Sequence, residues 1–130
     1  MMKKGIGLLV TAILAALLII SCAAKEEKAA HSDIKGHSID ISTGDFYEAC
    51  DKWPPGAKVS FKFTRTAPVM FNVHYHQKHA KVYAIEQTLV DTYEGSFIVQ
   101  SDDIHCCMWK NDNPDFVTLK YDMSVEAAKK

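Results

Sequence analysis

Period-two alternation of apolar and polar residues is the feature that most constrains this chain. In KVSFKFT, residues 58–64, the side chains of Val59, Phe61 and Phe63 would point to one face of a strand and the polar residues to the other. VMFNVHYH, residues 69–76, alternates in the same way. No window of ten or more residues has a convincing helical stripe, except a weak one near the C-terminal end. The sequence therefore predicts an all-β fold.

The number and spacing of the alternating segments indicate the architecture. Further strands are expected near residues 39–41, 82–86, 95–100, 104–109 and 116–123, and turn residues such as WPPG at 53–56 separate them. Seven or eight short strands, roughly 10 to 15 residues apart, are typical of two sheets packed face to face. We expect one antiparallel β-sandwich in which each strand buries one face.

The first residues have the pattern of a targeting segment. Two lysines precede an apolar run from Ile6 to Ile20. This run is shorter than the roughly 20 residues that span a bilayer as a helix. Residues 1–21 are therefore predicted to be a signal peptide and not a fold element.

The sequence Ile19-Ile20-Ser21-Cys22 resembles the bacterial lipobox. The resemblance implies removal of residues 1–21 and attachment of two or three acyl chains, such as palmitate, at Cys22. Several chains hold a protein on a membrane far more firmly than one chain does. Ala23 is not the Asp that usually retains lipoproteins in the inner membrane. In a diderm we therefore expect the periplasmic face of the outer membrane, and in a monoderm the outside of the cell membrane. An uncleaved anchor and plain secretion are the alternatives.

The remaining chain divides into a tether, a domain and a tail. Residues 22–35 hold the lipidated Cys22 and small or charged residues, as expected of a flexible tether. Residues 36–126 form the predicted sandwich domain, and residues 127–130 a C-terminal tail. Without residues 1–21 the chain has 13 basic and 16 acidic side chains, a net charge of −3 with His neutral. No basic stripe interleaves with aromatic residues, so we expect no nucleic-acid partner.

Three segments of the domain resemble a known family. DFYEACDKWPPGAKVSFKF, FNVHYH, and HCCMWKN followed by FVTLKYD are similar to a GOLD-type β-sandwich, the luminal domain of cargo receptors in the early secretory pathway. The resemblance extends over most of residues 37–123. It rests on an early Cys beside aromatic residues, a Pro-Gly turn, and a late aromatic-rich strand that ends in Asn. It implies a domain that binds proteins or lipids and is not an enzyme.

The exported part of the chain has three cysteines besides Cys22, and an oxidising compartment favours a disulfide among them. Cys106 and Cys107 are neighbours in a strand and point to opposite faces, so Cys50 pairs with one of them. The GOLD resemblance places alternate residues of the late strand toward the core, namely His105, Cys107 and Trp109. It therefore implies a Cys50–Cys106 disulfide and a buried Cys107 thiol. The alternative is Cys50–Cys107 with an exposed, reactive Cys106.

Three of the six histidines lie in NVHYHQKHAK, residues 72–81. His74 and His76 project from the same side of a strand with Cβ atoms about 6.5 to 7 Å apart, so both can reach one metal ion, while His79 falls in the following turn. Met70 shares their face, and Met108 would join them if the late strand is their neighbour. Imidazole and thioether ligands favour copper. The alternative is that the histidines are strand residues that hydrogen-bond locally.

No residue pattern indicates catalysis. No Ser lies in a nucleophile elbow, and adjacent Asp102 and Asp103 diverge, which is poor geometry for an acid and base pair. We therefore expect a membrane-anchored lipoprotein whose non-enzymatic β-sandwich binds an envelope protein, a lipid or another small ligand. The alternatives are a periplasmic copper-binding protein that uses His74 and His76, and a structural component of the envelope.

Overall fold

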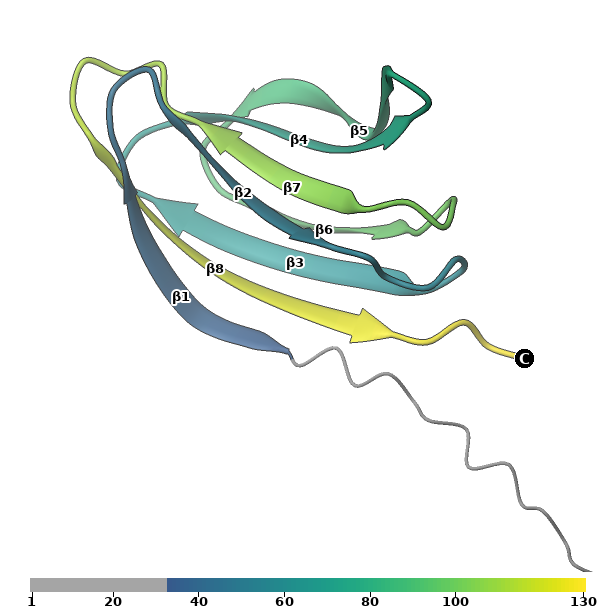
Figure 1. Ribbon diagram of the computed structural model, residues 1–130. Coiled ribbons are helices and arrows are strands. Elements are labelled where there is room, and N and C mark those ends of the chain that lie inside the picture. Colours follow the sequence, from purple (N-terminus) through teal and green to yellow (C-terminus); the bar gives the residue numbers. More distant parts are fainter. Residues whose placement is uncertain (1–32) are drawn as a thin grey trace, which may run out of the picture.

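A computed structural model describes residues 33–130 of the chain (Figure 1). The predicted signal peptide, Cys22 and most of the predicted tether lie outside the described residues. Within residues 33–130, no helix is long and apolar enough to cross a membrane. The described chain forms eight strands: β1 (Ile34–Ile41), β2 (Phe46–Asp51), β3 (Lys58–Arg65), β4 (Val69–Gln77), β5 (Ala80–Val90), β6 (Tyr93–Ile98), β7 (His105–Lys110) and β8 (Val117–Glu126).

The strands form two four-stranded sheets, with the strand orders β1-β8-β3-β6 and β2-β7-β4-β5. Every paired neighbour is antiparallel. Of the connections between consecutive strands, the one from β4 to β5 stays within a sheet, and the others lead from one sheet to the other (Figure 1). The predicted all-β, two-sheet antiparallel sandwich is confirmed.

The N-terminal part of the domain differs from the expectation in two ways. β1 begins at Ile34, where it pairs with Met123, so the fold starts two residues before the expected boundary at Gly36. The segment Phe46–Asp51 had not been anticipated as a separate strand, and it forms β2 at the edge of its sheet. β8 ends at Glu126, the expected end of the domain.

The core between the sheets is aromatic, and Trp109 of β7 lies at its centre. Trp109 is fully buried, and its ring centroid lies 5.5 Å from that of Phe71 and 5.6 Å from that of Phe63. The Tyr121 ring of β8 is 5.0 Å away. Aromatic rings in such offset arrangements contribute about 0.5 to 1.5 kcal/mol per pair beyond the area that they bury. Alternate residues of the other strands complete this core, among them Val59, Phe61, Val69, Val73, Val117 and Leu119.

A buried asparagine joins the loops at one end of the sandwich. The Asn111 side-chain amide donates hydrogen bonds to the carbonyl oxygens of Ile41 and Asp115, at 2.9 and 2.8 Å. Its side-chain oxygen accepts from the backbone N–H of Asn113 at 2.8 Å, and its own N–H donates to the Asp45 carbonyl at 2.9 Å. These bonds satisfy a fully buried polar side chain and connect the β1–β2 turn with the β7–β8 loop.

A disulfide joins β2 to β7. The sulfur atoms of Cys50 and Cys106 are bonded at 2.04 Å, and this is the pair that the GOLD resemblance implies. The two residues face each other directly in the β2–β7 ladder, on the outer face of the sheet. Closing a loop with a sequence separation of 56 stabilises a fold by about 4 kcal/mol through lost chain entropy in the unfolded state. Cys107 is fully buried on the inner face, where desolvation raises the pKa of its thiol, so this group stays protonated.

Candidate functional site

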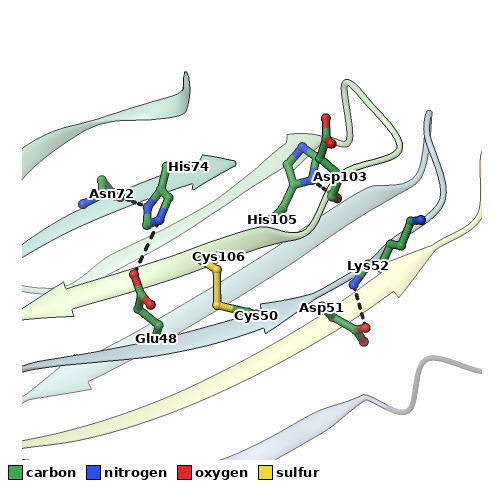
Figure 2. Close-up of a disulfide and its surroundings, with 9 residues drawn as sticks. All are labelled: Glu48, Cys50, Asp51, Lys52, Asn72, His74, Asp103, His105 and Cys106. Atoms are coloured by element: carbon green, nitrogen blue, oxygen red, sulfur yellow. Dashed lines mark hydrogen bonds and ion pairs between the residues drawn. A yellow bond between two sulfur atoms is a disulfide. The ribbon is translucent and has the colours of Figure 1, made fainter. Parts of the chain in front are cut away.

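The outer face of the β2-β7-β4-β5 sheet brings three chemically active groups together (Figure 2). His74 of β4 lies opposite Cys106 of β7, and Cys106 lies opposite Cys50 of β2. Glu48 precedes Cys50 by two residues and shares its face. The adjacency of β4 and β7, on which a metal site at His74 depends, is therefore present.

These side chains are close enough to act together. The His74 Nε2 atom lies 3.5 Å from the Glu48 Oε1 atom. One potential ligand atom from each of Glu48, His74 and Cys106 lies within 4.8 Å of the other two. We call Glu48, Cys50, His74 and Cys106 the outer-sheet cluster.

His74 is only 1% exposed, although it lies on the outer face of its sheet. The β4–β5 pairing explains this difference from an ordinary surface position. Phe71 pairs with Thr88, and His74 pairs with Tyr83. Between these two pairs, β5 advances by five residues while β4 advances by three, so β5 is bulged. Such bulges bend and twist a strand. The Tyr83 ring packs edge-on against the imidazole, with centroids 6.4 Å apart.

Hydrogen bonds hold the His74 ring in one orientation. The buried Asn72 donates its side-chain N–H to the Gln87 Oε1 atom at 3.3 Å, which turns its own Oδ1 atom toward His74. That Oδ1 atom is 2.7 Å from His74 Nδ1. Because an amide oxygen only accepts, Nδ1 carries the proton and Nε2 has a free lone pair. The lone pair and the Glu48 carboxylate are then two acceptors that face each other, and a proton or a metal cation can bridge them.

Burial determines the charge of this imidazole. Desolvation is the largest of the causes that lower the pKa of His74 from 6.5 to about 4, and the nearby Lys81 and His76 contribute in the same direction. His74 is therefore neutral at pH 7, and its Nε2 lone pair is available.

The other histidines of NVHYHQKHAK have different surroundings. His76 is exposed, and its ring lies edge-on to that of His74 with centroids 5.3 Å apart. His79 is exposed in the β4–β5 turn, where its backbone N–H donates to the Gln77 carbonyl at 3.0 Å. The adjacent Lys78 has a positive φ of 53°. The structure thus brings His76 next to His74 and leaves His79 in the turn, away from the cluster.

The two predicted methionine ligands also differ. Met108 is half-buried and lies opposite Asn72, two residues along the ladder from the His74–Cys106 pair. Met70 lies opposite Lys110. At about 3.3 Å per residue, Met70 is roughly 13 Å along the strand from His74. The structure therefore places Met108 at the border of the cluster and Met70 beyond it.

Glu48 is the cluster residue that sequence reasoning missed. It lies on β2, in the segment FYEACD at residues 46–51. Tyr47 and Ala49 of this strand pack against the core, so Glu48 and Cys50 must share the outer face. The alternation of side chains along this strand could have predicted that Glu48 lies beside Cys50. Adjacent aromatic residues at its start obscure that alternation in the sequence.

His105 is buried in the core and takes no part in the cluster. Its ring stacks on that of Tyr75 at 4.5 Å, and its Nδ1 atom donates to the Asp103 carbonyl at 2.9 Å. Asp103 also accepts a hydrogen bond from the Ser101 hydroxyl at 2.7 Å, so these residues organise the β6–β7 turn.

Of three surface hollows among the described residues, one borders the outer-sheet cluster. Two hollows of about 410 and 570 Å³ lie over the outer face of the other sheet. A smaller cleft of about 260 Å³ lies at the β2 edge, where Glu48 and Cys50 line it together with Tyr47, Trp53 and Tyr121. Two residues of the cluster, Glu48 and Cys50, therefore border this cleft, whereas His74 and Cys106 do not line it.

No protein-family model matches this chain, and a search of curated proteins finds no match.

The lowered pKa of His74 predicts a specific pH dependence of stability. The folded state favours the neutral imidazole, so the unfolded chain binds more protons between about pH 6.5 and 4. Stability should be complete above pH 6.5 and fall by up to about 3 kcal/mol as the pH drops through this window. Urea unfolding of the wild type and of His74→Gln, measured at intervals from pH 7.5 to 3.5, checks this. The variant should lack that part of the slope, and identical profiles would contradict it.

Proposed function

We propose that this chain is a membrane-anchored lipoprotein whose non-enzymatic β-sandwich binds a protein of the cell envelope. The binding surface is the outer face of the β2-β7-β4-β5 sheet. The observation that carries the proposal is a row of large side chains at one end of this face. Phe46 of β2 is 59% exposed and Leu89 of β5 is 63% exposed. Met70 and Lys110 lie between them in the same register.

The contrast between the two outer faces supports this choice of surface. The row from Phe46 to Leu89 crosses four strands, about 14 Å at the usual strand spacing. Exposed aromatic and aliphatic side chains that gather in this way favour protein contacts. The outer face of the other sheet mostly presents hydroxyl and charged side chains, among them Ser60, Lys62, Thr64, Lys120, Asp122 and Ser124. Ile98 of β6 is an exposed aliphatic residue of that sheet.

The anchor supports an envelope partner. The lipobox at residues 19–22 and the tether lie outside the described residues, and the proposal takes them from the sequence. A lipid at Cys22 would leave a short linker before β1 begins at Ile34. The folded domain would then work within a short distance of the membrane surface. The GOLD resemblance points to the same kind of function, protein or lipid binding without catalysis.

The anchor is tested by lipid labelling. Cells that express the full chain are fed an alkyne analogue of palmitate, and the purified protein is examined for the label. We expect label on the wild type and none on Cys22→Ala. Cys107→Ala is the matched control and should stay labelled, because Cys107 is buried in the folded domain. An unlabelled wild type would remove the anchor from the proposal.

The binding face is tested by cross-linking in intact membranes. Phe46→Lys combined with Leu89→Lys places two charges on the proposed surface and should remove the cross-link to a partner. Ile98→Lys is the control, because Ile98 is 53% exposed but belongs to β6 of the other sheet. Equal cross-linking by all three proteins, or its loss only in the control, would contradict the face proposed here.

Copper binding by the outer-sheet cluster is a second candidate function. Metal-bound histidines almost always donate their other ring N–H to a carbonyl or carboxylate oxygen, as His74 does to Asn72. The free Nε2 atom faces Glu48, and the His76 ring lies next to it. Nitrogen and oxygen donors suit Cu(II). In this arrangement Glu48 is a copper ligand. The ligand set predicted from the sequence included Met70 and did not include Glu48.

Copper titration separates this candidate from the first. The full chain, with its disulfide intact, is titrated with Cu(II) by calorimetry and electron paramagnetic resonance. His74→Ala combined with His76→Ala should weaken binding by at least about tenfold, because it removes both imidazole ligands. His79→Ala, in the exposed turn, should bind as the wild type does. Binding that the double variant leaves unchanged would exclude the cluster as a copper site.

A further inference from the structure

Four side chains on three neighbouring strands have the composition of a thiolate metal site once the disulfide is open. Glu48 and Cys50 come from β2, Cys106 from β7 and His74 from β4 (Figure 2). We infer that reduction of the Cys50–Cys106 disulfide converts the outer-sheet cluster into a site for one thiophilic divalent ion of the zinc class. Its ligands are the two thiolates, the His74 Nε2 atom and the Glu48 carboxylate.

The distance between the nitrogen and oxygen ligands fits this geometry. Zinc binds imidazole nitrogen and carboxylate oxygen at about 2.0 to 2.2 Å, usually in a tetrahedron. Two such ligands are then about 3.4 Å apart. The His74 Nε2 and Glu48 Oε1 atoms are 3.5 Å apart. Two corners of the tetrahedron are therefore at the required separation before an ion binds.

The sulfur ligands need only a local change. Zinc–sulfur bonds of about 2.3 Å place two sulfurs about 3.8 Å apart in a tetrahedral site. Cys50 and Cys106 have Cα atoms 4.1 Å apart and face the same side of the sheet. Once the disulfide is open, rotation of the two side chains suffices to reach that separation. The Cys106 Sγ atom already lies within 4.8 Å of the ligand atoms of Glu48 and His74.

His74 is held ready to bind a cation. Its Nδ1–H donates to Asn72, so the Nε2 lone pair is on the side of Glu48. The imidazole is 1% exposed and packs against Tyr83, so the ring cannot turn toward solvent without a change in packing. A ring fixed in this tautomer and orientation is the usual state of a metal-bound histidine.

The site is accessible to a reductant and to an ion. β2 is an edge strand, and Cys50 is exposed on it. Glu48 is partly exposed and lines the cleft of about 260 Å³ at that edge. A thiolate can therefore attack the Cys50 sulfur from solvent, and an ion can enter along the same side.

The reaction balances with a dithiol as the reductant. The dithiol transfers two electrons and two protons to the Cys50–Cys106 disulfide. The products are two protein thiols and a cyclic disulfide formed from the dithiol. Each thiol loses a proton to solvent when it binds the ion. Zn²⁺ with two thiolates and one carboxylate leaves a site of net charge −1. Exchange with a cyclic disulfide of the same class, which is reduced to the dithiol, re-forms the Cys50–Cys106 disulfide and releases the ion.

This inference shares His74 and Glu48 with the copper candidate but does not depend on it. The copper candidate concerns the disulfide form, with nitrogen and oxygen ligands. The present site requires the reduced form, with two thiolates. Copper titration of the oxidised protein and zinc titration of the reduced protein therefore succeed or fail separately.

The test uses the full chain in detergent with Cys22→Ser, which removes the thiol outside the domain. The disulfide is reduced by a phosphine, which takes an oxygen atom from water and leaves two thiols, and the phosphine is then removed without air. Zn²⁺ and the coloured substitute Co²⁺ are titrated into the oxidised and the reduced protein. We expect one ion per chain in the reduced form, at least about 100-fold tighter than in the oxidised form. The Co²⁺ complex should show the sulfur-to-metal absorption of a tetrahedral site.

Matched variants identify the ligands. Cys50→Ser combined with Cys106→Ser should abolish tight binding, and His74→Gln and Glu48→Gln should each weaken it by about tenfold or more. His79→Gln and Cys107→Ala should not change it. Far-UV circular dichroism of the reduced, zinc-bound chain should match that of the oxidised protein. The inference is overturned if the reduced chain binds no zinc, if it stays unfolded with zinc, or if His74→Gln and Glu48→Gln bind as tightly as the wild type.

Discussion

Burial of Trp109 between the two sheets is the constraint on which the rest of this structure depends. A slip of β7 by one residue would move Trp109 and Cys107 to the outer face and bring Cys106 and Met108 into the core. Loss of a buried Trp side chain from a core typically costs about 3 to 5 kcal/mol, so the observed register is strongly favoured. That register places Cys106 opposite both Cys50 and His74. The aromatic core on one side of β7 thereby positions the cluster on the other.

Part of the outer face of the β2-β7-β4-β5 sheet is shielded from solvent, and this shielding determines the chemistry of the outer-sheet cluster. Asn72 and His74 lie on a face that ordinarily meets solvent, yet both are buried. A buried imidazole is neutral, and the Asn72 bond leaves its lone pair on the side of Glu48. At an exposed position water would solvate the same groups, and they would have no preferred orientation. In the zinc site that we infer, the disulfide beside them supplies two sulfurs, which bind metal only when they are reduced.

Much of the fold was predictable because side-chain direction in a strand is a local property. Alternation predicted two packed sheets and placed His74 and His76 on one face, which the strand bounds and the inward-facing residues of β4 bear out. β2 was harder to recognise. Phe46 and Tyr47 are adjacent and both apolar, although one faces solvent and the other the core. Because such a pair hides the period of two, Glu48 was not placed beside Cys50.

The sequence by itself determined which side chains share a face within each strand, since the pleat of an extended chain requires that alternation whatever surrounds it. It also determined, through its turn residues and apolar periodicity, that the chain forms short strands in two layers. Only the tertiary structure decided that β7 lies between β2 and β4, because most connections cross from one sheet to the other and neighbours along the chain are seldom neighbours in a sheet. It also decided that the bulged β5 covers His74. Pairing across long distances and local slips in register depend on the packing of the whole domain, and no single segment encodes them.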